Sequence, residues 1–179
     1  SGAVLESLNY SLANSSLTYF VGQTTSTAVY FIKVSHDSTT GAVDTGWYNL
    51  TVSQADTSKD YESETNDTQG LADSLVLGRT TMGELTQETD VDWYKITPTQ
   101  AGALEIVFTD NFSGGWYGSH LYKIDITDAS GAVLESFDYS VANSSSTYHV
   151  GVTSTAAHYI KVSHDSTTGA VDTGWYNLT

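Results

Sequence analysis

The sequence predicts an all-β protein with the architecture of a jelly-roll-like antiparallel β-sandwich. Three observations lead to this prediction. Short stretches of alternating apolar and polar residues recur, turn-forming residues separate them, and no window carries a sustained helical stripe. The composition agrees, since the chain has a single proline and is rich in serine, threonine, tyrosine and valine. About eight or nine short strands at this spacing are typical of a sandwich or a jelly roll.

About four strands are expected in residues 1–51, and the others lie in the C-terminal two thirds of the chain. In residues 104–108 the even-numbered apolar positions share one face. By the same alternation Val133, Phe137 and Tyr139 are expected to share a face, and residues 66–73 are expected to hold a short helical turn. The other expected strands are 75–77, Val91–Ile96, 122–126, 148–152, 160–162 and 176–178. Turns are expected at 128–131, 143–145 and 168–169.

An internal repeat organises the chain. Residues 1–51 and 130–179 are identical at about four positions in five, with one residue deleted in the second copy. Residues 1–51 are therefore expected to be the C-terminal part of a preceding, truncated repeat unit. Residues 52–60 read as a polar linker and residues 61–179 as one complete β-sandwich unit. Neighbouring repeat units are the expected partners, because spacers and binding modules are multiplied in this way more often than active sites.

The charge balance restricts the possible partners. The net charge is −15 and Lys+Arg is only 6, which argues against nucleic acid and against an anionic membrane surface. No stretch approaches the ~20 apolar residues of a membrane span, so membrane insertion is not expected. The absence of cysteine excludes disulfides, thiolate metal sites and cysteine nucleophiles. An acidic surface attracts cations, and the alternative to a bound metal is a generic solvated surface.

Two acidic segments form the best candidate for a metal site. The candidate ligands are Glu62, Glu64, Asn66, Asp67, Asp90 and Asp92. Calcium takes six to eight hard oxygen ligands, including carboxylates and carbonyls. Residues i and i+2 of an extended segment are about 6.6 Å apart, so the first segment must curl to bring its oxygens to one ion. The glycine and closing glutamate of an EF-hand loop are absent.

These residues resemble the bacterial pre-peptidase C-terminal domain. The resemblance covers about residues 60–179 and rests on four motifs. They are Glu62-x-Glu64-x-Asn66-Asp67, Gly83, Asp92-Trp93-Tyr94-Lys95-Ile96 and Ala101-Gly102-x-Leu104. The family, which includes the collagen-binding domains of clostridial collagenases, implies a jelly-roll sandwich in secreted proteins, often in tandem. It also implies calcium chelation by Glu62, Glu64, Asn66, Asp67 and Asp92, with Asp90 or its neighbour Thr89 as a further ligand.

Two functions follow as hypotheses, and neither is catalytic. The first is a calcium-binding repeat or adhesion module of a secreted or cell-surface bacterial protein. The alternative is an accessory domain that holds a secreted hydrolase on a polysaccharide or on a fibrous protein such as collagen. Trp116 and Tyr117, in a glycine-rich loop, are the candidate ligand-binding residues for that role. No enzyme is expected, because the adjacent residues of Ser163-His164-Asp165 cannot form a catalytic triad.

Overall fold

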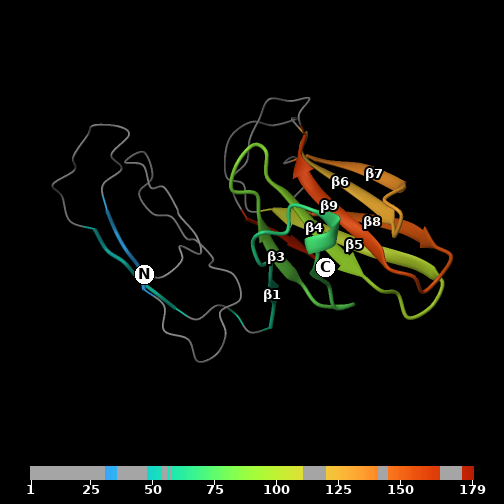
Figure 1. The fold of residues 1–179 in the computed structure, drawn as a ribbon, viewed down its shortest axis with the longest axis horizontal. Helices are drawn as coiled ribbons and strands as arrows, with labels where there is room; N and C mark the ends of the chain where they lie inside the picture. The colour runs from blue at the N-terminus through green and yellow to red at the C-terminus, as the bar shows by residue number, and fades with distance from the viewer. Residues whose placement is uncertain are drawn as a thin grey trace. The chain divides into compact units, whose positions relative to one another are not determined.

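The computed structural model describes residues 31–35, 48–53, 56, 58–110, 120–140, 145–165 and 175–179. The chain divides into two compact units, Ser1–Asp56 and Thr57–Thr179. In the first unit the described residues form neither strand nor helix and are exposed. All the regular elements described below belong to the second unit (Figure 1). Within the described residues, no helix is both long enough and apolar enough to cross a membrane.

The described part of the second unit contains ten strands and one short 3₁₀ helix. In chain order these are β1 (Asp60–Tyr61), η1 (Gln69–Leu71), β2 (Asp73–Ser74), β3 (Thr81–Glu84), β4 (Val91–Ile96), β5 (Gly102–Asp110), β6 (His120–Asp128), β7 (Val133–Ser140), β8 (Ser146–Val152), β9 (His158–His164) and β10 (Trp175–Leu178).

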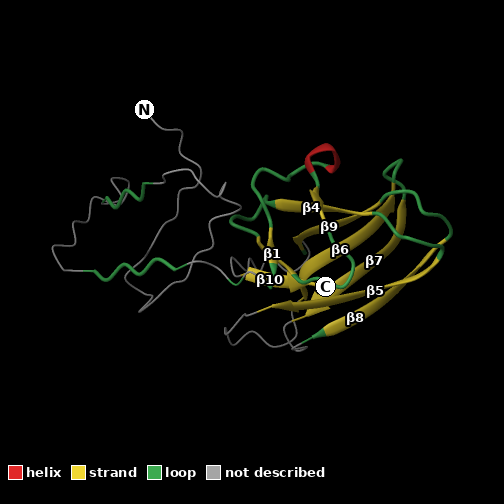
Figure 2. Cartoon of the chain, turned by 90° about the horizontal axis from the view of Figure 1, so that it is seen from below, coloured by secondary structure: helices red, strands yellow, loops and turns green. Residues whose placement is uncertain are grey.

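The strands form two sheets of a β-sandwich (Figure 2). One sheet has the order β1-β3-β10-β5-β8 and the other the order β2-β4-β9-β6-β7. From β3 to β10 the chain passes between the sheets in the order of a jelly roll, and the neighbouring strands are antiparallel. This confirms the predicted fold class. The two short edge strands β1 and β2 differ from the prediction, because each pairs in parallel with its neighbour.

A cluster of aromatic rings fills the space between the sheets. Tyr94, Tyr122, Tyr139 and Tyr176 are fully buried together with Phe108. The centroid of the Phe108 ring lies 5.1 Å from that of Tyr122, 4.8 Å from that of Tyr139 and 5.0 Å from that of Tyr176. Aromatic side chains bury large areas and favour such offset contacts, so this cluster forms the centre of the core.

Several local predictions are confirmed. The expected strand Val91–Ile96 coincides with β4, and the 3₁₀ helix Gln69–Leu71 lies within the expected helical turn. The turn at 128–131 is also present, with the Gly131 N–H donating to the Asp128 carbonyl at 3.0 Å and Gly131 at a φ of +85°. The predicted turns at 143–145 and 168–169 fall wholly or mostly outside the described residues.

Two local predictions are wrong, and two short strands were not predicted. Residues 75–77 are not a strand, since β2 ends at Ser74. The short strands β1 and β3 were not expected, because pairing with neighbouring strands defines them and neither sequence alternates clearly. Val133 does not share a buried face with Tyr139, because it is 58% exposed. A register shift between Ile126 and Thr127 changes how the start of β7 pairs with β6.

Candidate metal site

The acidic segment that follows β1 enters the sandwich beside β3. The Glu62 N–H donates to the Met82 carbonyl at 3.0 Å, which continues the β1–β3 pairing and fixes the Glu62 backbone. The Glu62 side chain is buried. One of its carboxylate oxygens accepts the Glu84 N–H at 2.5 Å, and the other accepts the Tyr94 hydroxyl at 2.7 Å. Pairing of a short edge strand therefore places a carboxylate inside the fold.

Two phenols connect Glu62 to a second buried carboxylate. Tyr94 and Asp92 lie on β4, where alternation directs both side chains inward, and Tyr176 lies on β10 of the other sheet. The Tyr94 and Tyr176 hydroxyl oxygens are 2.7 Å apart, and the Tyr176 hydroxyl donates to Asp92 Oδ2 at 2.5 Å. This acid–phenol network, consisting of Glu62, Tyr94, Tyr176 and Asp92, bridges the two sheets.

Burial opposes the ionisation of both carboxyl groups in this network. Burial raises the pKa of Glu62 to about 8, against the lowering effect of its hydrogen bonds. Burial, followed by the charge of Glu62, raises the pKa of Asp92 well above its ordinary value.

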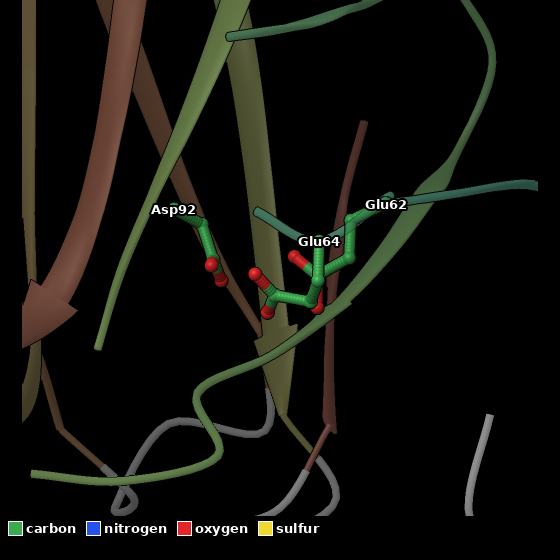
Figure 3. Close-up of side chains that lie close together, drawn as sticks. All are labelled: Glu62, Glu64 and Asp92. Atoms are coloured by element: carbon green, nitrogen blue, oxygen red, sulfur yellow. The ribbon is translucent and has the colours of Figure 1, made fainter. Parts of the chain in front are cut away.

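Further carboxylates gather around this pair in two overlapping groups. Glu62, Glu64 and Asp92 each offer an oxygen, and these oxygens lie within 4.8 Å of one another. Figure 3 shows the three carboxyl groups turned toward one another. Oxygens of Glu64, Asp67 and Asp90 meet the same distance criterion. Glu64 belongs to both groups, so the five acidic residues expected from the sequence come together around one side chain.

Asn66 lies at the same place, and its side chain has no protein partner. The Trp93 N–H donates to the Asn66 carbonyl at 3.1 Å, which holds Asn66 against β4 next to Asp92. Asn66 is fully buried, and neither polar atom of its amide has a hydrogen-bond partner; Asp92 Oδ1 has none either. Buried polar groups are normally hydrogen-bonded. Two buried oxygens without partners beside several carboxylates fit a hard cation.

Asp90 is held more firmly than the other candidates. Its Oδ2 accepts the Thr86 N–H at 2.5 Å and the Thr86 hydroxyl at 2.7 Å, and its Oδ1 accepts the Val91 N–H at 2.9 Å. These bonds fix the loop between β3 and β4 and direct Asp90 toward Glu64 and Asp67. Glu64 and Asp67 themselves are exposed, so they form the open side of the site.

The residues that support the acidic ligands were not predicted from the sequence. Tyr94 and Tyr176 were expected only as residues of strands, and their hydroxyl groups hold the two buried carboxylates. Gly83 was noted only as part of a motif. A Cβ atom there would lie 2.5 Å from Tyr176 Cζ and closer still to the Tyr94 hydroxyl, so glycine provides the room for the two phenols. The signal available in the sequence was a glycine within a strand, which often marks close approach of another group.

The other sequence candidates give no second site among the described residues. His164 lies in β9 with its ring stacked beside Tyr122, at a centroid distance of 6.2 Å. Its neighbour Ser163 points to the opposite face of the strand, as consecutive strand residues do. Trp116 and Tyr117 fall outside the described residues.

Comparison with known proteins found similarity to solved structures. No protein-family model and no curated protein matches the chain. Among solved structures, the chain is similar to the pre-peptidase C-terminal domain of a collagenase from Bacillus anthracis. The TM-score is 0.45 and the sequence identity 14%, over 60% of this chain and 92% of that one.

Proposed function

We propose that residues 57–179 form a non-catalytic, calcium-binding β-sandwich module of a secreted or cell-surface protein, which acts as a repeat or adhesion module. The observation that supports this proposal is the convergence of four carboxylates on that of Glu64, beside the unpartnered oxygens of Asn66 and Asp92. Without a cation, carboxylates this close repel one another and those that are buried lack solvation.

The types of ligand favour calcium over other metals. Every candidate ligand atom is a carboxylate or amide oxygen, whereas zinc and copper sites are rich in histidine and cysteine. Magnesium demands near-ideal octahedral geometry and keeps several waters, while calcium accepts six to eight ligands from a flexible set. Extracellular calcium modules work with dissociation constants of about 10⁻⁴–10⁻³ M, which suits a site with an exposed side.

A bound ion would fix the start of the module mechanically. Glu62, Glu64, Asn66 and Asp67 lie on the segment between β1 and η1, while Asp90 and Asp92 belong to the β3–β4 loop and β4. A shared ion would tie that segment to the sandwich and fix the direction in which the chain enters. Calcium would thereby stiffen a series of such modules, which is the role proposed for the repeated units.

Calorimetric titration of the chelator-treated chain with calcium tests this function. We expect saturable binding in the parent protein. We expect the affinity to fall at least about tenfold in Glu64→Gln, which is a loss of about 1.4 kcal/mol. Glu64 is the best residue to change because it is exposed and belongs to both carboxylate groups.

The matched control is Glu105→Gln, which removes the same charge from an exposed residue of β5 beside His149. Calcium binding there should equal that of the parent. An absence of calcium binding in the parent, or an equal loss of affinity in both variants, contradicts the proposed function.

A further inference from the structure

A serine and an aspartate form a clamp across the acidic segment. The Ser63 N–H donates to Asp73 Oδ2 and the Ser63 hydroxyl donates to Asp73 Oδ1, each at 2.7 Å. Ser63 lies between two candidate metal ligands, Glu62 and Glu64. Asp73 belongs to neither of the two carboxylate groups of the candidate site. One carboxylate thus accepts both hydrogen bonds that this serine can donate, from a position ten residues further along the chain.

Asp73 is fixed to the sheet that carries Asp92. Strand β2 begins at Asp73 and pairs in parallel with β4, where Asp73 lies opposite Tyr94. The Leu75 N–H continues this pairing by donating to the Lys95 carbonyl at 2.8 Å. The acidic segment itself leaves the other sheet, in which β1 pairs with β3. The Ser63–Asp73 clamp therefore joins a segment that leaves one sheet to a fixed point on the other.

Holding Ser63 in this way directs the residues on either side of it. Consecutive side chains of an extended chain point to opposite sides. With Ser63 turned to Asp73, the carboxylates of Glu62 and Glu64 share the other side, where their oxygens and one of Asp92 lie within 4.8 Å of one another (Figure 3). Glu64 gains most from this, because it is exposed and belongs to both carboxylate groups.

Such a clamp increases affinity by ordering the ligands before the ion arrives. A segment that is already held in its bound orientation loses less conformational freedom on binding. Residues that hold metal ligands in place are accordingly important in many metal sites, and their replacement typically lowers metal affinity about 10–100-fold.

We propose that Asp73 is a positioning residue of the calcium site, which acts through Ser63 to hold Glu62 and Glu64 toward the ion. This inference rests on the proposed function, because it concerns the same site. Both Asp73 oxygens accept hydrogen bonds from Ser63, so the influence of Asp73 on calcium passes through the serine.

Ser63→Ala tests the clamp without changing the charge of the site. The measurement is calorimetric titration of the chelator-treated chain with calcium. We expect the calcium affinity of Ser63→Ala to fall about fivefold, which is the size of effect expected from one hydrogen bond. Ser63→Thr keeps the hydroxyl group and should restore the affinity of the parent. Asp73→Ala removes both hydrogen bonds and should lower the affinity at least about tenfold.

The double variant Ser63→Ala, Asp73→Ala separates positioning from direct attraction of calcium by Asp73. If Asp73 acts through the serine, the double variant should bind calcium as well as Asp73→Ala alone, because the hydroxyl has already lost its acceptor. If Asp73 acted as a ligand or through its charge, Ser63→Ala would keep the affinity of the parent, or the two losses would add.

The matched control is Ser130→Ala in the β6–β7 turn. The Ser130 N–H and hydroxyl donate to Asp128 Oδ1 at 2.8 and 2.6 Å, so the same kind of pair is broken away from the site. We expect Ser130→Ala to keep the calcium affinity of the parent. The melting temperature of each variant in chelator gives its effect on stability separately, and a purely structural clamp at Ser63 would change that temperature alone.

Three results would overturn the positioning role. They are parent affinity in Ser63→Ala, additive losses in the double variant, and an equal loss in Ser130→Ala. Each of them requires a parent protein that binds calcium. A parent that binds none contradicts the proposed function and the positioning role together, so the two failures are distinguishable.

Discussion

At the scale of single residues, the acid–phenol network explains why acidic side chains can lie inside this fold. Glu62 and Asp92 are buried, but each accepts a hydroxyl proton from a tyrosine that itself belongs to the core. The two tyrosines come from opposite sheets and meet over Gly83. Removing one member of a buried polar network costs more than the network contributes, because its partner is left unsatisfied.

Gly83→Ala should therefore destabilise the module. The added Cβ would force the two phenols out of place, and overpacking of this kind costs about 1–3 kcal/mol. The measurement is the free energy of unfolding in urea. The control is Gly151→Ala in β8, where a Cβ meets no atom within 4 Å. Equal stability of the two variants would show that the phenols do not need the space at Gly83.

At the scale of secondary-structure elements, a single carboxylate organises the β6–β7 turn. Asp128 Oδ1 accepts the Ser130 hydroxyl at 2.6 Å, the Ser130 N–H at 2.8 Å and the Ala132 N–H at 3.0 Å. These bonds, that from the Ser130 hydroxyl first, hold the pKa of Asp128 below its ordinary value of 3.8. The turn matters for the whole sandwich because it starts the C-terminal copy of the repeated sequence.

Stability should depend on pH through this turn. A lowered pKa in the folded state means that the Asp128 carboxylate stabilises the fold above the unfolded-state pKa of 3.8. The contribution disappears as the pH falls through the folded-state pKa. We therefore expect Asp128→Ala to be less stable than the parent near pH 7 and to approach it as the pH falls well below 3.8. Denaturation at several pH values measures the difference, with Asp138→Ala on β7 as the control. A difference that does not change with pH would contradict this role.

At the scale of the whole molecule, the proposed ion would join the acidic segment to the rest of the jelly roll. A ligand that binds only the folded state stabilises by about 2.7 kcal/mol at 100 times its dissociation constant. We expect calcium to raise the melting temperature of the parent by several degrees and that of Glu64→Gln much less. A melting temperature that is the same in calcium and in chelator would argue against an ion in the folded module.

The two copies of the repeat also predict a pattern of hydrogen exchange across the molecule. Residues 32–35 and 160–163 have the same sequence, so differences in amide exchange between them report structure. Only the second set is paired in a sheet among the described residues. We expect the first set to exchange at least about 100-fold faster, which is about 2.7 kcal/mol. Peptides from the two copies can be told apart by mass, because Tyr30-Phe31 precede the first segment and His158-Tyr159 precede the second. Equal protection would show that the first copy is equally well folded.

Much of this protein could be predicted without the structure. Alternation at positions such as 104–108 and 122–126 predicted the sandwich, because a strand with one buried face must place apolar residues at every second position. The acidic residues around Glu64 were also recognisable, since hard-oxygen ligands crowded in sequence suggest a cation. The repeat can be detected by comparing the sequence with itself. These features are local, so they are visible in the sequence.

Only the tertiary structure decided how distant residues meet. Pairing with β3 and β4 makes strands of Asp60–Tyr61 and Asp73–Ser74, which have no strand pattern of their own. The contact of Tyr176 with Asp92 joins residues 84 positions apart and depends on the jelly-roll order. The same order brings Thr179 and Asp60 into contact with Thr80. Local pattern selects the elements, whereas the packing of two sheets selects their partners, because burial is shared among segments far apart in the chain.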